Sequence, residues 1–94
     1  MSDAVLIARL DRAIAVIVAA PSKRKVRQAR TRADRVIGAV SLDAYVAWLN
    51  RDGGGLIGAD RWRERGVTTA RALGDILNGE VRRAKWKDRY NDFD

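Results

Sequence analysis

Residues 3–22 have the sequence DAVLIARLDRAIAVIVAAPS, and this stretch decides the fold class. Its apolar residues recur at the three- and four-residue spacing of one helix face, at Leu6, Leu10, Ala13, Ile14 and Ile17. Valines between them widen that face until little polar surface remains. Pro21 would end such a helix, because proline disfavours helical geometry in the residue before it. We therefore expect a helix over 3–20 that is buried nearly all round, either centrally in the domain or across a homodimer interface.

A residue with a hydroxyl side chain precedes each long apolar pattern. There it can accept a hydrogen bond from a free backbone N–H at the start of a helix. Ser2 or Asp3 caps the first helix, Ser22 caps a second that runs to about residue 40, and Ser41 caps a short third. A single helical turn over 59–65 carries Trp62 inward. Thr68 or Thr69 begins a last helix with an apolar stripe.

No run of residues alternates with period two, so strands are not expected. The pattern predicts an all-α fold, a small bundle of four principal helices plus one short helical turn. The chain of 94 residues is too short for a second core, so residues 1–94 are expected to form a single helical domain. We expect residues 91–94 to fray.

Residues 53–58, GGGLIG, match the letters of the GxGxxG dinucleotide-binding motif. In that motif the glycines join a strand to a helix, whereas here a predicted helix precedes them. We interpret 53–58 as a glycine-rich loop and predict no cofactor.

The residue types needed for catalysis are scarce. The chain has no histidine and no cysteine, its three serines stand at helix starts, and its carboxylates are scattered, mostly beside arginines. We therefore predict no enzymatic activity, no catalytic residue and no metal site. The lack of cysteine suits a reducing compartment, and no apolar run is long enough to cross a bilayer. These features predict a cytoplasmic protein without membrane contact.

The net charge of +7 is concentrated in one segment. Residues 23–40 carry seven basic side chains against one carboxylate, Asp34. A basic face of this kind favours an anionic partner such as nucleic acid, an acidic protein or anionic lipid, and phosphates are the natural candidate. Arginine would hold phosphates, and Gln28 and Thr31 could contact base edges. The candidate nucleic-acid-binding residues are Arg24, Arg27, Gln28, Arg30, Thr31, Arg32 and Arg35. The alternatives are a solvated arginine-rich face, or one that is paired with the acids of 41–60.

A second candidate surface lies near the end of the chain. Opposite the stripe of Leu73, Leu77 and Val81, arginines and aromatic residues alternate in a way that suits a protein partner or single-stranded nucleic acid. The candidate partner-binding residues are Arg82, Arg83, Trp86, Arg89, Tyr90 and Phe93. The favoured alternative is that Asn78-Gly79 breaks the helix, so that the aromatic residues pack on the core.

Arginine supplies 15 of the 19 basic residues and alanine is equally abundant, as coding by a GC-rich genome would also produce. This composition is similar to that of small accessory proteins of actinobacteria or their phages, and it transfers no site. Two functions follow as expectations. One is a small basic accessory protein that binds nucleic acid through phosphate contacts. The other is a phage-type or actinobacterial protein-interaction module, an inhibitor or adaptor that docks on a host protein or on a second copy of the chain.

Overall fold

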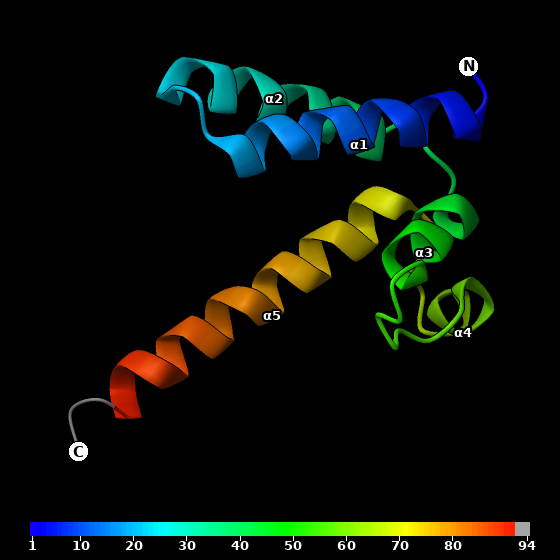
Figure 1. Ribbon diagram of the computed structural model, residues 1–94. Helices are drawn as coiled ribbons and strands as arrows, with labels where there is room; N and C mark the ends of the chain where they lie inside the picture. Colours follow the sequence, from blue (N-terminus) through cyan, green and yellow to red (C-terminus); the bar gives the residue numbers. More distant parts are fainter. Residues whose placement is uncertain (92–94) are drawn as a thin grey trace.

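The computed structural model describes the backbone of residues 1–91 and the side chains of residues 1–84 (Figure 1). Over this range the fold is all-α, with four principal helices and one short one as the sequence predicts. The helices are α1 (Asp3–Ala19), α2 (Lys23–Ile37), α3 (Leu42–Asn50), α4 (Ala59–Glu64) and α5 (Ala70–Asn91). Asn91 ends α5, and the rest of the expected frayed tail lies outside the described residues.

The helices are arranged as an antiparallel hairpin with the remaining elements at one of its ends (Figure 1). Helices α1 and α2 lie side by side along their length. Helices α3 and α4 gather beneath the end of the hairpin where the chain begins, and α5 starts there and runs obliquely away. The outer side of α2 is therefore left uncovered by the other helices.

Hydroxyl caps begin the helices where the sequence predicts them. The hydroxyl oxygens of Ser2, Ser22 and Ser41 accept hydrogen bonds from the backbone N–H three residues later, at 3.2–3.3 Å. Thr69 does the same for α5, since its Oγ1 accepts from the Ala72 N–H at 3.1 Å. These four bonds explain why the starts of the helices were predictable from single residues.

The link between α1 and α2 depends on an unusual backbone conformation. Ala20 has φ 47° and ψ 52°, in the left-handed region, and its N–H donates to the Val16 carbonyl at 3.0 Å. Glycine adopts this conformation without the steric penalty that a Cβ brings. The single Ala20 therefore carries strain at the turn that reverses the chain.

We expect Ala20→Gly to raise the free energy of unfolding by about 0.5–1 kcal/mol. Relief of left-handed strain is worth roughly 1–2 kcal/mol, and the greater freedom of glycine in the unfolded chain offsets about 0.4–1 kcal/mol of it. Urea denaturation followed by circular dichroism measures the difference. The control is Ala19→Gly inside α1, which should instead lower stability by about 1 kcal/mol; destabilisation by both substitutions would contradict the assignment.

The core centres on Leu10 of α1 and Leu73 of α5, both of which are 0% exposed. Ala29 and Ala33 of α2 are buried against α1, and their small side chains let the two helices approach closely. The remaining buried core residues are Leu6, Ala13, Val36, Val40, Leu42, Tyr45, Val46, Trp62, Val67 and Ala70. Trp62 is buried, as predicted from its place in the short helical turn.

The expectation that α1 is buried nearly all round is wrong for the single chain. Val5 is 45% exposed and Val18 is 78% exposed. Much of the outward side of α1 is alanine, which exposes little apolar area, so one packed face suffices to hold the helix. The homodimer interface stays a prediction.

Residues 53–58 form the predicted loop, between α3 and α4. Asn50 holds it from both sides, since its Oδ1 accepts from the Leu56 N–H at 2.9 Å and its Nδ2 donates to the Leu56 carbonyl at 3.2 Å. Gly53 and Gly55 have φ of +77° and +68°, a conformation that favours glycine. The glycines are thus explained by the turn itself.

Candidate nucleic-acid interface

The outward face of α2 presents all seven residues that the sequence singles out for nucleic-acid binding. Each of Arg24, Arg27, Gln28, Arg30, Thr31, Arg32 and Arg35 is exposed. They stand on a helix whose opposite side, through Ala29, Ala33 and Val36, is buried against the rest of the molecule. Burial of one stripe therefore holds the basic side chains toward solvent.

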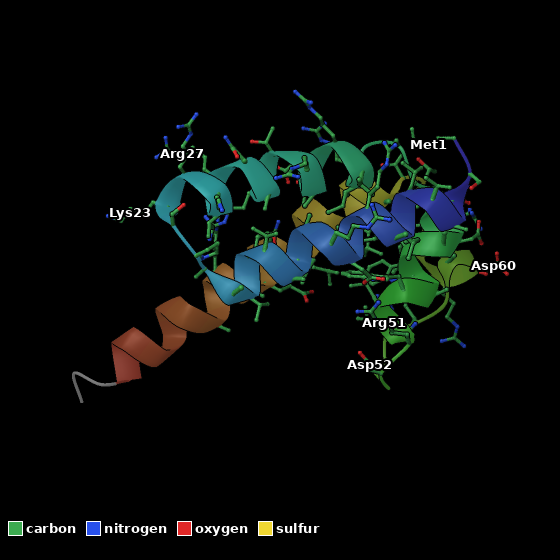
Figure 2. The ribbon with its side chains drawn as sticks, turned by 45° about the horizontal axis from the view of Figure 1, so that its top comes forward. Met1, Lys23, Arg27, Arg51, Asp52 and Asp60 are labelled. Carbon is green, nitrogen blue, oxygen red and sulfur yellow. The ribbon has the colours of Figure 1, made fainter. Side chains whose placement is uncertain are left out.

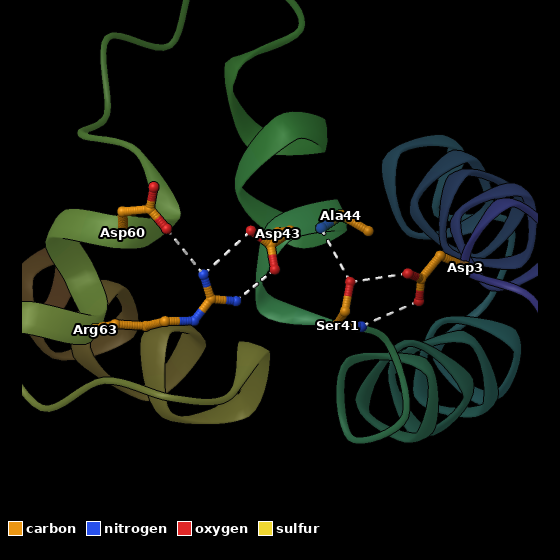
Figure 3. Close-up of polar contacts among 6 residues, drawn as sticks. All are labelled: Asp3, Ser41, Asp43, Ala44, Asp60 and Arg63. Carbon is orange, nitrogen blue, oxygen red and sulfur yellow. Dashed lines mark hydrogen bonds and ion pairs between the residues drawn. The ribbon is translucent and has the colours of Figure 1, made fainter.

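Several of the described carboxylates form ion pairs away from α2. Asp43 and Asp60 both form ion pairs with Arg63, and this bonding joins α3 to α4 (Figure 3). Asp52 pairs with Arg51 at 3.5 Å. Among residues 1–84, no ion pair involves a side chain of α2. The alternative in which the acids of 41–60 neutralise α2 therefore fails for the described side chains.

Two further carboxylates on α1 also serve the fold. Asp3 accepts hydrogen bonds from the backbone N–H and the hydroxyl of Ser41, at 3.1 and 2.8 Å (Figure 3). Asp11 accepts from Trp48 Nε1 at 2.9 Å and from Arg51 Nη1 at 2.6 Å. These bonds tie α1 to α3. Like the Arg63 pairs, they use acidic groups to join helices, and these acids are not paired with the cations of α2.

The hydrogen bonds shift the pKa values of the groups that take part. The bond from Trp48, and then that from Arg51, lowers the pKa of Asp11, because both favour the ionised carboxylate. A hydrogen bond from Arg63 lowers the pKa of Asp43 in the same way. These carboxylates therefore stay charged at neutral pH, and the separation of acidic and basic groups persists there.

Figure 2 shows how far the two kinds of charge are separated. Lys23 and Arg27 point outward at the turn end of α2, whereas Asp52 and Asp60 lie at the opposite end of the molecule. These two basic side chains of α2 are thus remote from Asp52 and Asp60.

Two side chains of the face use hydrogen-bond donors on backbone carbonyls of α2 itself. The Thr31 hydroxyl donates to the Arg27 carbonyl at 3.1 Å, and Arg32 Nε donates to the Gln28 carbonyl at 3.5 Å. Thr31 has then used its one donor, so its oxygen can only accept from a ligand. Gln28 keeps both the donor and the acceptor of its side-chain amide, which makes it the better candidate for base contacts.

Two arginines that the sequence reasoning missed join this surface. Arg9 and Arg12 of α1 line a hollow together with Arg32 and Arg35 of α2. Their spacing of three places Arg9 and Arg12 on one face of α1, and this was visible in the sequence. What was not visible is the side-by-side, antiparallel placement that brings this part of α1 to the late part of α2.

The second candidate surface is described only in part. Arg82 and Arg83 are exposed on α5. Trp86, Arg89 and Tyr90 belong to the same helix, but their side chains lie outside the described residues, as does the whole of Phe93. The expectation that Asn78-Gly79 breaks the helix is wrong, because α5 continues through both residues to Asn91. The structure does not bring Arg82 and Arg83 to the α2 face.

Within the described part of the chain, no helix is long and apolar enough to cross a membrane. Over the same residues, no three acidic side chains come together in a group that could hold a metal ion. Comparison of the chain with models of known families, with curated proteins and with solved structures gave no match, so its function must be argued from the surface of α2 itself.

Proposed function

We propose that this protein binds nucleic acid, mainly through phosphate contacts from the exposed arginines of α2, and acts as an accessory protein with no reaction of its own. The observation that carries the proposal is the row of outward cations to which no described carboxylate is paired. We infer a cytoplasmic setting on a separate ground, the absence of cysteine from the chain.

The energetic argument starts from repulsion within α2. Arg24, Arg27 and Arg30 follow one another at intervals of three, and each such pair of like charges disfavours a helix by about 0.2–0.5 kcal/mol. A phosphate placed between two guanidinium groups turns that repulsion into attraction. The arginine fork can also hold two phosphate oxygens at once. A polyanion therefore stabilises an arrangement that the free protein holds under strain.

The first test is the dependence of binding on salt. Binding of phosphates releases condensed counterions, so contacts by about five arginines predict a slope of about −4.5 in log K against log salt. Between 50 and 200 mM salt, the affinity should then fall by about 500-fold. Fluorescence anisotropy with a labelled oligonucleotide measures this slope. Absence of binding at low salt would remove the proposal.

A matched pair of charge reversals separates α2 from the basic character of the whole chain. Arg27→Glu with Arg30→Glu should weaken binding by about 100-fold or more, because phosphate contacts are lost and repulsion is added. Arg61→Glu with Arg65→Glu changes the net charge equally at exposed positions around α4, and should weaken it only a few-fold through long-range effects. An equal loss of nucleic-acid affinity in the two double variants would show that α2 has no special role.

A second candidate function, a protein-interaction module, rests on a different observation. Helix α5 extends beyond the bundle, and its apolar residues Ile76 and Val81 are 38% and 55% exposed. A host protein or a second copy of the chain could cover them. The same titrations distinguish this candidate, because its binding would depend weakly on salt, would not change with the α2 charge reversals and would be lost with Val81→Glu, a change at an exposed position.

A further inference from the structure

The hollow between α1 and α2 combines charged walls with an apolar floor. Its volume is about 570 Å³, and its walls carry Arg9 and Arg12 on one side and Arg32 and Arg35 on the other. The floor is made by the aliphatic residues Ala13, Val16 and Val36. We call these seven residues the arginine groove. Pockets that take small organic groups span about 300–1,000 Å³, so this groove is large enough for one.

A second hollow adjoins the groove on the outer side of α2. It is a shallow, open depression, lined by Gln28, Thr31, Arg32 and Arg35. Arg32 and Arg35 are common to both hollows and form the ridge between them. A chain-like ligand bound along the outer face of α2 could therefore cross this ridge into the arginine groove.

The lining restricts the chemistry of the ligand. Four guanidinium groups line the groove and no carboxylate of residues 1–84 does, so its charge favours a ligand that is negatively charged. The aliphatic floor favours a ligand with apolar surface, because covering apolar side chains with an apolar group is favourable. A phosphate has no such surface and would gain nothing there. A nucleotide supplies both parts, because its phosphate is anionic and its base has a flat face that packs on apolar groups or guanidinium planes.

We propose that the arginine groove takes a base of single-stranded nucleic acid, with the adjoining phosphates held by Arg9 and Arg12 on one wall and Arg32 and Arg35 on the other. The proposal rests on the proposed function and adds the form of nucleic acid that is preferred. Bases of a duplex are paired and stacked inside it and cannot enter a groove, whereas bases of a single strand can turn outward.

An acidic helix from a protein partner is a weaker fit to the same walls. A helix that docks in a groove needs apolar anchors over about two turns, at spacings such as i, i+3, i+4 and i+7. On α1 the floor consists of Ala13 and Val16, which span one turn, and on α2 it consists of Val36 alone. The floor is long enough for a base and too short for such a helix.

The test compares a labelled 12-nucleotide single strand with the duplex of the same sequence, in the full chain at fixed salt. Arg9→Gln with Arg12→Gln should weaken single-strand binding by about 10-fold or more, since two phosphate contacts are lost, and duplex binding by only a few-fold. Both side chains are exposed, so the fold should tolerate the change.

Val16→Lys tests the floor by adding a positive charge, whereas the arginine substitutions remove two. If only charge mattered, an added lysine would tighten all binding. An occupied floor predicts instead that single-strand affinity falls by about 10-fold while duplex affinity is unchanged or higher, because stacking contacts of a base are lost. The matched control is Ala15→Lys, which adds the same charge at an exposed position of α1 outside the groove. Circular dichroism checks that both variants fold.

Each outcome separates the groove from the wider proposal. Equal affinity for single strand and duplex, or no effect of the Arg9 and Arg12 substitutions, would overturn the groove while the Arg27 and Arg30 reversals still test α2. Displacement of the single strand by an acidic helical peptide that binds more tightly would also overturn it, in favour of a protein partner. If no oligonucleotide binds at low salt, both the groove proposal and the proposed function are overturned.

Discussion

Replacement of Leu73 by alanine should lower the free energy of unfolding by about 3–5 kcal/mol. Leu73 is 0% exposed and stands with the buried Ala70 and Gly74 in the first turns of α5. Leu73 lies in the hydrophobic core, enclosed by other buried residues. Its truncation would therefore leave a cavity that the surrounding side chains fill only in part.

The size of this loss matters because the whole domain is small. A chain of 94 residues has an unfolding free energy of about 5–14 kcal/mol, so Leu73→Ala removes a large share of it. The melting temperature should fall by about 15–25 °C. The control is Leu77→Ala, one turn later and half-buried, which should lose about 1–2 kcal/mol. A loss at Leu73 no larger than that at Leu77 would show that α5 is not anchored as described.

Asp11→Ala is expected to destabilise the fold by about 1–2 kcal/mol. The substitution leaves the half-buried Trp48 Nε1–H without its 2.9 Å acceptor and removes the partner of Arg51. A buried donor without a partner is unfavourable by about 1–3 kcal/mol, while the higher helix propensity of alanine returns about 0.5 kcal/mol. Asp11→Asn keeps an acceptor for Trp48 and loses the charge, so it should lie between alanine and the unchanged protein.

The same carboxylate gives the stability a definite dependence on pH. The pKa of Asp11 is lowered in the folded state, chiefly by the Trp48 hydrogen bond and then by that of Arg51. Its contribution is therefore complete above the ordinary aspartate pKa of about 3.9 and is lost as the pH falls through the lower, folded value. Urea titrations at pH 7 and pH 2.5 should show that the difference between Asp11→Asn and the unchanged protein shrinks in acid. A difference that is constant with pH would contradict this account.

Local features of the fold were predictable because single residues determine them. Ser2, Ser22 and Ser41 each hold the N–H three residues later, and Pro21 closely follows the end of α1. The short turn with Trp62 and the buried stripe of α2 likewise follow from spacing alone.

Features that depend on neighbours were not predictable in the same way. Asn78-Gly79 is a typical break signal, yet α5 continues through it, because a helix already anchored by Leu73 can extend over residues of low propensity. The arginine groove was missed for a related reason, since it exists only where Arg9 and Arg12 meet residues of another helix. The basic face of α2 needed no such knowledge and was found from its charge.

The excess of positive charge on α2 also has a kinetic consequence. Seven basic side chains and one carboxylate lie on α2, whereas Asp52 and Asp60 lie at the opposite end of the molecule, so the charge of the described residues is unevenly distributed, with its positive side toward α2. In the field of a polyanion the molecule experiences a torque, which turns that side forward before the two surfaces touch. The rate of encounter should thus respond to ionic strength more steeply than the lifetime of the complex once formed.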